Sequence, residues 1–209
     1  MNRKILAFGI IALLFVACKS KEEKANELIK AELHKTLYDF ASYDPIETIV
    51  DSAFTSIYKD STILSYAYTI QACLNLYDEH MKETKDAIST AETWSDSYSS
   101  YGRSKFNDAR EKAQTNLEKA KFYIQKAQET RPLIKEEIDS FTPSFIGFQA
   151  KHKFRCKTKG GHSSIANYLY IIDDKFKTVL SVTDTNDEDE LKIRKLIEES
   201  KDYKKEEEE

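Results

Sequence analysis

The stretch that decides the fold is residues 63–91, ILSYAYTIQACLNLYDEHMKETKDAISTA, followed after a polar linker by residues 106–138, FNDAREKAQTNLEKAKFYIQKAQETRPLIKEEI. In the first stretch apolar and small residues recur at alternating steps of four and three, the spacing of a heptad repeat. The positions are Ile63, Ala67, Ile70, Leu74, Tyr77, Met81, Thr84, Ile88 and Ala91. This spacing predicts one long amphipathic helix.

The second stretch carries a matching stripe. Its sevenfold series is Phe106, Ala113, Ala120, Ala127 and Ile134, interleaved with Leu117, Ile124 and Ile138. The only glycine between Pro45 and Pro132 is Gly102, in the polar linker 95–104, so we expect the two helices to divide there. We therefore predict an antiparallel helical hairpin, a coiled coil over residues 61–140, with arms roughly 50 Å long at about 1.5 Å per residue.

The sequence outside the hairpin predicts a small sheet. Residues 46–54, IETIVDSAF, are rich in β-branched side chains, and three alternating runs follow Pro143, separated by the turn signals Gly160-Gly161 and Asp173-Asp174. Amphipathic patterns near residues 22–40 and 187–203 predict flanking helices. The expected fold class is α+β, mostly helical: a long antiparallel helical hairpin and a small antiparallel sheet domain with flanking N- and C-terminal helices. The segments are 27–60 (helix and strand), 61–140 (hairpin), 141–203 (three-stranded meander and closing helix) and 204–209 (disordered acidic tail).

The N-terminus has the pattern of an export signal. In residues 1–17, MNRKILAFGIIALLFVA, two cations precede an apolar run of about 13 residues, too short to span a bilayer but typical of a signal peptide. Residues 14–18, LFVAC, resemble the lipobox of bacterial lipoproteins, with Phe15 in place of the usual leucine. The resemblance implies that residues 1–17 are removed, that Cys18 is acylated, palmitate being a typical chain, and that residues 18–26 form a lipidated tether.

The mature part resembles small uncharacterised envelope lipoproteins of Bacteroidota. The resemblance rests on residues 37–47, LYDFASYDPIE, on residues 147–157, GFQAKHKFRCK, and on Gly160-Gly161. It implies that an N-terminal helix and strand pair with the C-terminal meander, so that the long antiparallel helical hairpin is inserted into the small antiparallel sheet domain, and it carries no activity. Residues 19–23, KSKEE, resemble the signal that sends such lipoproteins to the cell surface. The expected location is therefore the bacterial cell envelope, at the outer membrane, with surface exposure left open.

The charge balance excludes nucleic acid as a partner. The chain has 32 Lys+Arg and 36 Asp+Glu, for a net charge of −4, and removal of Arg3 and Lys4 with the signal leaves a mature charge of −6. No basic patch interleaved with aromatics remains to neutralise phosphates. Of the two cysteines left after acylation, Cys73 falls in a helical repeat and Cys156 in a strand pattern. Both positions favour free thiols, although the sequence leaves a disulfide open.

The sequence shows no catalytic, cofactor or metal site, and we expect no cofactor. The four histidines, His34, His80, His152 and His162, are not grouped with carboxylates or thiols at ligand spacing. Gly160-Gly161 lacks the spacing of a nucleotide-binding loop, and Ser163 lacks the context of a hydrolase nucleophile. A small envelope hydrolase or ligand carrier with a site near His162 remains the alternative function.

The candidate interaction residues are Trp94, Tyr98 and Tyr101, beside Gly102 in a serine-rich linker. Tyrosine and serine together are typical of adaptable binding surfaces, although such aromatics can also simply anchor a loop. The sequence therefore predicts a membrane-anchored envelope lipoprotein with a structural or interaction role. Its expected partners are the membrane, through the lipid, and a protein or glycan at the hairpin tip.

Overall fold

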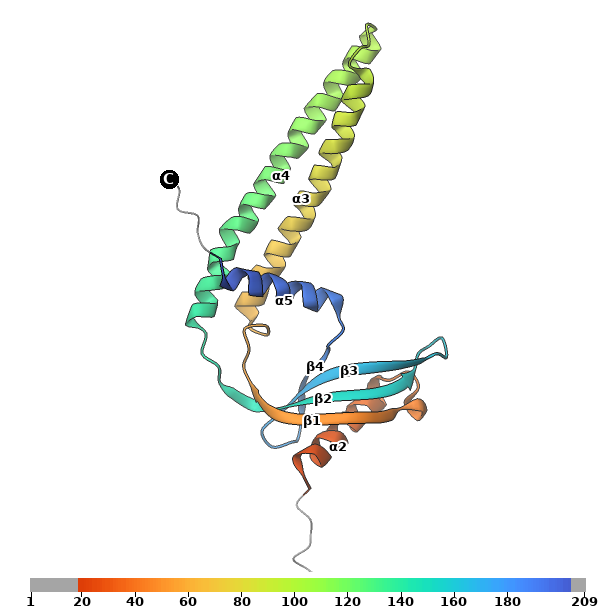
Figure 1. Ribbon diagram of the computed structural model, residues 1–209, viewed down its shortest axis with the longest axis vertical. Coiled ribbons are helices and arrows are strands. Elements are labelled where there is room, and N and C mark those ends of the chain that lie inside the picture. The colour runs from red at the N-terminus through yellow and green to blue at the C-terminus, as the bar shows by residue number, and fades with distance from the viewer. Residues whose placement is uncertain (1–18, 204–209) are drawn as a thin grey trace, which may run out of the picture. The chain divides into compact units, whose positions relative to one another are not determined.

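The computed structural model describes residues 19–203, and shows an α+β fold (Figure 1). The elements are α2 (Lys21–Thr36), η2 (Phe40–Ser42), β1 (Asp44–Phe54), α3 (Ser61–Trp94), α4 (Ser100–Ser140), β2 (Phe145–Lys157), β3 (Ser163–Ile172), β4 (Val179–Asp184) and α5 (Glu188–Lys201). The predicted fold class is confirmed. The signal peptide, Cys18 and the tail 204–209 lie outside the described residues. No helix within residues 19–203 is long and apolar enough to cross a membrane.

The chain divides into two compact units. The sheet unit contains the residues up to Phe54 together with Ser144–Asn186, and the helical unit contains Thr55–Pro143 and the residues from Asp187 onward. The sequence grouped the closing helix with the meander in segment 141–203. The contacts of α5 place it in the helical unit instead, because its apolar face packs on the hairpin.

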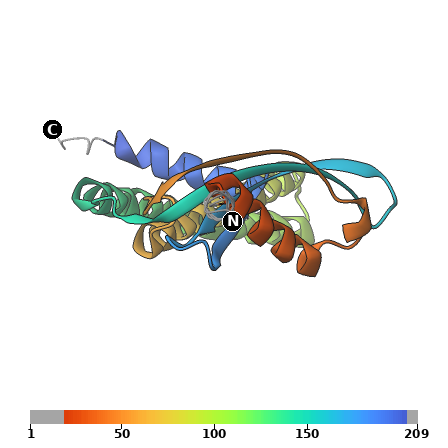
Figure 2. The same cartoon turned by 90° about the horizontal axis from the view of Figure 1, so that it is seen from below.

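The sheet unit is a four-stranded antiparallel sheet in the order β1-β2-β3-β4. The helix α2 covers one face of it, as Figure 2 shows from below. The buried side chains between them are Ala25, Ile29, Leu33, Ala150, Phe154, Tyr170 and Ile172. The segment 21–26, assigned from the sequence to a tether, is the start of α2. A capping box explains this: Ser20 Oγ accepts from the Glu23 N–H, and the Glu23 carboxylate accepts from the Ser20 N–H.

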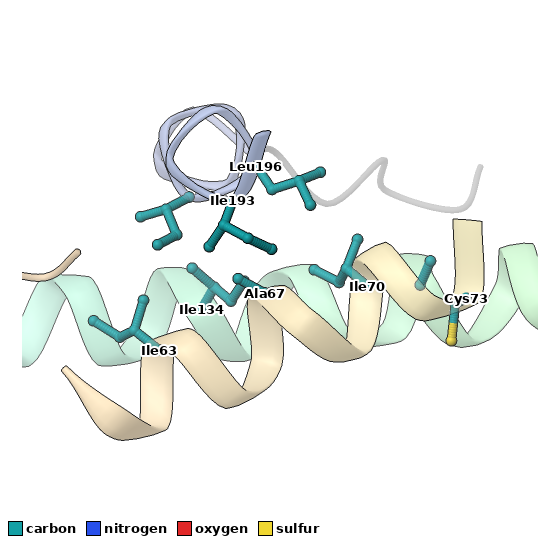
Figure 3. Close-up of a cluster of buried hydrophobic side chains, with 9 residues drawn as sticks. Ile63, Ala67, Ile70, Cys73, Ile134, Ile193 and Leu196 are labelled. Atoms are coloured by element: carbon teal, nitrogen blue, oxygen red, sulfur yellow. The ribbon is translucent and has the colours of Figure 1, made fainter. Parts of the chain in front are cut away.

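The helical unit is the α3–α4 hairpin with α5 across its base. Figure 3 shows Ile193 and Leu196 of α5 directed toward Ala67 of α3 and Ile134 of α4. The base is therefore a three-helix core. Farther along, α3 and α4 pack on each other without a third element among residues 19–203. The buried residues there are Thr84, Ala87, Ala91, Gly102, Ala109, Asn116 and Ala120. Small side chains let the two backbones approach closely, as the alanine series predicted.

The seam differs in register from the predicted stripes. In several places the buried residue is the smaller neighbour just before the predicted one: Cys73 for Leu74, Ala87 for Ile88, and Asn116 for Leu117. Ile88 is 46% exposed and Leu117 is 37% exposed. The predicted use of Leu117 in the seam is therefore wrong. A close contact between helices selects small side chains, so each helix turns its larger residue outward.

Cys73 and Cys156 are both free thiols. Cys73 is buried in the helical unit, whereas Cys156 packs against the core of the sheet unit. The expectation of two unpaired cysteines is confirmed for this structure.

Candidate functional site

The hairpin tip is built by two helix ends and a five-residue connection, Ser95–Ser99. The chain turns before Gly102, not at it. Ser99 caps α4, its Oγ accepting from the Gly102 N–H (3.0 Å), so Gly102 lies in the first helical turn. A Cβ on Gly102 would lie 1.9 Å from Ser97 Oγ. The glycine is therefore needed for close packing under the loop, not for a turn.

The structure brings two of the three predicted aromatics together. The Trp94 and Tyr101 rings meet edge to face, with centroids 5.7 Å apart, and Lys105 Nζ lies 5.5 Å from the Tyr101 ring centroid. Tyr98 stands apart and is 94% exposed, while Tyr101 is 62% exposed. Trp94 and Tyr101 therefore contact each other as loop-anchoring aromatics do, whereas Tyr98 is presented to solvent.

A groove runs beside the tip, between α3 and α4, with a volume of about 670 Å³. Ile88 and Ala91 line it from α3, and Phe106 and Ala113 from α4. The Arg110 guanidinium lies 5.5 Å from the Phe106 ring centroid, so a cation borders the apolar floor. Sequence reasoning missed this groove because it placed Ile88 and Ala113 in the buried seam.

A polar layer crosses the hairpin seam in its middle. Asn116 is 4% exposed and its Oδ1 lies 3.2 Å from His80 Nδ1, while the His80 ring stacks on Tyr123 with centroids 5.7 Å apart. Thr84 Oγ1 donates to the His80 carbonyl. A buried asparagine in a helical seam fixes the register, because any slip would leave its amide unpaired. The layer is therefore structural, and residues 19–203 hold no group of three potential metal ligands.

A second polar cluster lies under α2 in the sheet unit. His152 is 1% exposed; its Nε2 lies 2.9 Å from the Tyr43 hydroxyl and its Nδ1 lies 2.8 Å from Thr48 Oγ1. Thr48 in turn donates to Asn26 Oδ1 (2.6 Å). Because the single Thr48 hydroxyl proton goes to Asn26, the hydrogen bond between Thr48 and His152 must be donated by His152 Nδ1–H. The neutral ring then accepts the Tyr43 hydroxyl proton at Nε2. The four groups form one directed chain of hydrogen bonds.

The electrostatics of this cluster favour neutral groups. Burial lowers the pKa of His152 to about 4, and burial also raises the pKa of Tyr43. His152 is thus uncharged at neutral pH, and the Tyr43 phenol keeps its proton. Because its donors and acceptors are satisfied internally, the cluster orders the core of the sheet unit. The sequence carried no local signal for this cluster, because Thr48 and His152 face each other only through the pairing of β1 with β2.

Next to this cluster is a groove of about 650 Å³ between α2, η2 and β1. Phe40 and Tyr43 form its aromatic side, and Lys30 and Glu47 provide opposite charges. The hydroxyls of Tyr43 and Thr48 are already engaged with His152. The groove therefore offers a mixed surface without a set of free polar groups aimed at one ligand.

His162, the centre of the alternative function, lies in the exposed β2–β3 turn. Gly161 adopts a positive φ of +77°, and the turn closes through Thr158 N–H to the His162 carbonyl (2.9 Å). Across residues 19–203 the His162 side chain has no hydrogen-bond or ion-pair partner. In the part of the chain that the structure describes, no hydrogen bond or ion pair joins this ring to a nucleophile or an acid.

Comparison of the chain with protein families, with curated proteins and with solved structures found no match. The geometry of the chain itself is therefore the basis on which a function can be inferred.

Proposed function

We propose that the chain is a lipid-anchored protein of the bacterial envelope that uses the tip of the α3–α4 hairpin to hold another protein or a glycan. The observation that carries the proposal is the exposure of Tyr98, at 94%, next to a groove with an apolar floor. An aromatic ring on a well-ordered tip gains little for the fold, whereas tyrosine is enriched where surfaces bind partners.

The braced geometry of the tip supports a binding role. The Trp94–Tyr101 contact joins the two helix ends, and the Ser99 cap ties the connection to the start of α4. A preorganised tip loses little conformational entropy when a partner docks. Charges of both signs border the same region, Arg110 and Lys105 together with Glu92 and Glu111, so its surface combines apolar rings with mixed charge. Such a surface suits a partner that offers both apolar and charged or polar groups, as a protein segment or a glycan does.

The anchor rests on the lipobox-like residues 14–18 and is tested separately. In Cys18→Ser, we expect loss of incorporated alkyne-labelled fatty acid and release from the membrane fraction, because no helix within residues 19–203 is long and apolar enough to replace the lipid anchor. Cys73→Ser is the matched control and should label fully. Undiminished labelling of the Cys18 variant would refute the lipoprotein assignment.

The tip is tested by site-specific photocrosslinking in intact envelopes. A photoreactive residue at position 98 should give a discrete adduct, whereas the same residue at Phe122, 57% exposed on α4, should not. Tyr101→Ser should reduce the adduct from position 98 roughly thirtyfold, if the ring contributes about 2 kcal/mol to binding. Equal crosslinking from positions 98 and 122 would contradict the proposal. Digestion of the adduct with protease or with glycosidase distinguishes a protein partner from a glycan.

A further inference from the structure

The two edges of the sheet are protected to different extents. The β1 edge carries Pro45 and the charged residues Glu47 and Asp51, and its pairing with β2 is irregular at both ends. These are the features that prevent edge strands from pairing with other chains. The β4 edge, VLSVTD, has no proline or lysine, and it exposes Leu180 (54%) and Val182 (44%). Its single irregularity is at Leu180.

The backbone of β4 has unpaired groups on its outer side. The Thr185 N–H donates to the Asn167 carbonyl (3.1 Å), which marks this as a hydrogen-bonded pair in the β3–β4 ladder. Because such pairs alternate along antiparallel strands, the N–H and C=O groups of Val182 and Asp184 point away from β3. Within residues 19–203 no strand pairs with this side of β4.

A groove beside β4 can receive side chains of an added strand. It lies between β4 and α2, has a volume of about 370 Å³, and is lined by Leu28 and Ala31 of α2 and by Leu180 and Val182 of β4. A groove between an edge strand and a helix is the geometry in which a sheet accepts one more strand, with backbone bonds supplying affinity and the groove accepting side chains.

We propose that the added strand is β4 of a second copy of this chain, paired antiparallel about Ser181. Such pairing is two-fold symmetric and sets the exposed Leu180 of each copy opposite Val182 of the other. Because the irregularity at Leu180 adds one residue to each β4 strand, the pairing also places Lys177, which precedes β4, beside Asp184, which ends it in the other copy. The strand is thus self-complementary in both apolar surface and charge. The proposal is independent of the hairpin tip.

Exchange of the charges tests the pairing. Sedimentation velocity of the full chain in a mild detergent should show a concentration-dependent dimer. Lys177→Asp alone, or Asp184→Lys alone, puts like charges together at both ends of the pairing and should weaken the dimer roughly tenfold. In an equimolar mixture of the two variants, the aspartate introduced at position 177 faces the lysine introduced at position 184, and the native Lys177 faces the native Asp184. The dimer should therefore return in the mixture.

Two further variants separate pairing from folding. Val182→Pro removes an N–H that does not bond to β3, so it should abolish the dimer and leave the circular dichroism spectrum unchanged. Asp51→Lys, a charge change on the β1 edge, should leave the dimer intact. A monomer at every concentration overturns the proposal. A dimer that survives Val182→Pro, or one that the mixture fails to restore, overturns it equally.

Discussion

The core of the sheet unit and the seam of the hairpin are packed with side chains of opposite size. Under α2 the sheet buries large rings: Phe154 and Tyr170 are at most 1% exposed, and Phe154 contacts the rings of Tyr43, His152 and Tyr168. The distal hairpin instead buries alanines, Thr84 and Asn116. The sheet unit is therefore stabilised by the bulk of its side chains, and the hairpin by the closeness of two backbones.

Removal of a large ring from the sheet core should have the largest effect. Phe154→Ala should destabilise the sheet unit by about 3–5 kcal/mol, because it leaves a cavity that neighbouring rings cannot fill. Hydrogen exchange of the β2 and β3 amides in urea measures this directly. The control is Phe122→Ala on the hairpin surface, expected to cost no more than about 0.5 kcal/mol. A similar loss of stability in Phe154→Ala and Phe122→Ala would contradict the expected difference between the buried ring and the exposed one.

In the hairpin, a larger side chain in the seam should destabilise the fold more than a substitution on the surface does. Ala120 is fully buried, and Ala120→Leu forces extra methylene groups into the seam, at a cost of about 1–3 kcal/mol. The adjacent exposed change Lys121→Ala should stay within about 0.5 kcal/mol. Fluorescence of Trp94, the single tryptophan, follows unfolding of the hairpin. Equal melting temperatures for the two variants would mean that position 120 is not in the seam.

The two regions should also respond differently to acid. The folded pKa of His152, about 4, is lower than its ordinary value of 6.5, so the unfolded state binds the proton first as the pH falls. The stability from neutral His152 is fully present above about pH 6.5 and is lost toward pH 4. The sheet unit should lose about 1 kcal/mol between about pH 7 and 5.5.

Hydrogen exchange of residues 150–154 at several pH values measures this loss. In His152→Gln, the part of the pH dependence of stability that His152 contributes should disappear. If the stability of the variant depends on pH as strongly as that of the wild type, then groups other than His152 cause the dependence.

The smallest effect is expected at the tip. Tyr98→Ser should change hairpin stability by less than about 0.5 kcal/mol, because the ring is almost wholly in solvent. Tyr101→Ser should cost more, about 0.5–1.5 kcal/mol, since it breaks the contact with Trp94. Thermal melts of the two single variants make the comparison. Equal destabilisation would show that Tyr98 also braces the loop.

The periodicities predicted the elements but not their faces. The heptad spacing placed both arms of the hairpin, and the alternation placed the meander, because hydrophobic period reports secondary structure directly. The choice between Leu117 and Asn116, or between Ile88 and Ala87, depended on how closely two helices approach. The distance between the two helix axes is set by the side chains of both helices together, so the apolar pattern of one helix does not predict it.

The candidate sites divide in the same way. The aromatic composition of the linker was visible in the sequence, and it pointed to Trp94, Tyr98 and Tyr101. Only the structure separated the bracing residues from the presented one, because the difference is a ring contact across the loop. The same holds for the buried chain of Tyr43, His152, Thr48 and Asn26, whose members come from α2, β1, β2 and the loop before β1.

The sequence by itself determined which segments are helix and strand and that the linker is rich in aromatics, since these depend on local period, composition and breakers. Tertiary structure alone decided that α5 joins the hairpin, that His152 is neutral, and that β4 is the unprotected edge. Each of these depends on desolvation or pairing by residues distant in the chain, and such contacts carry no local pattern.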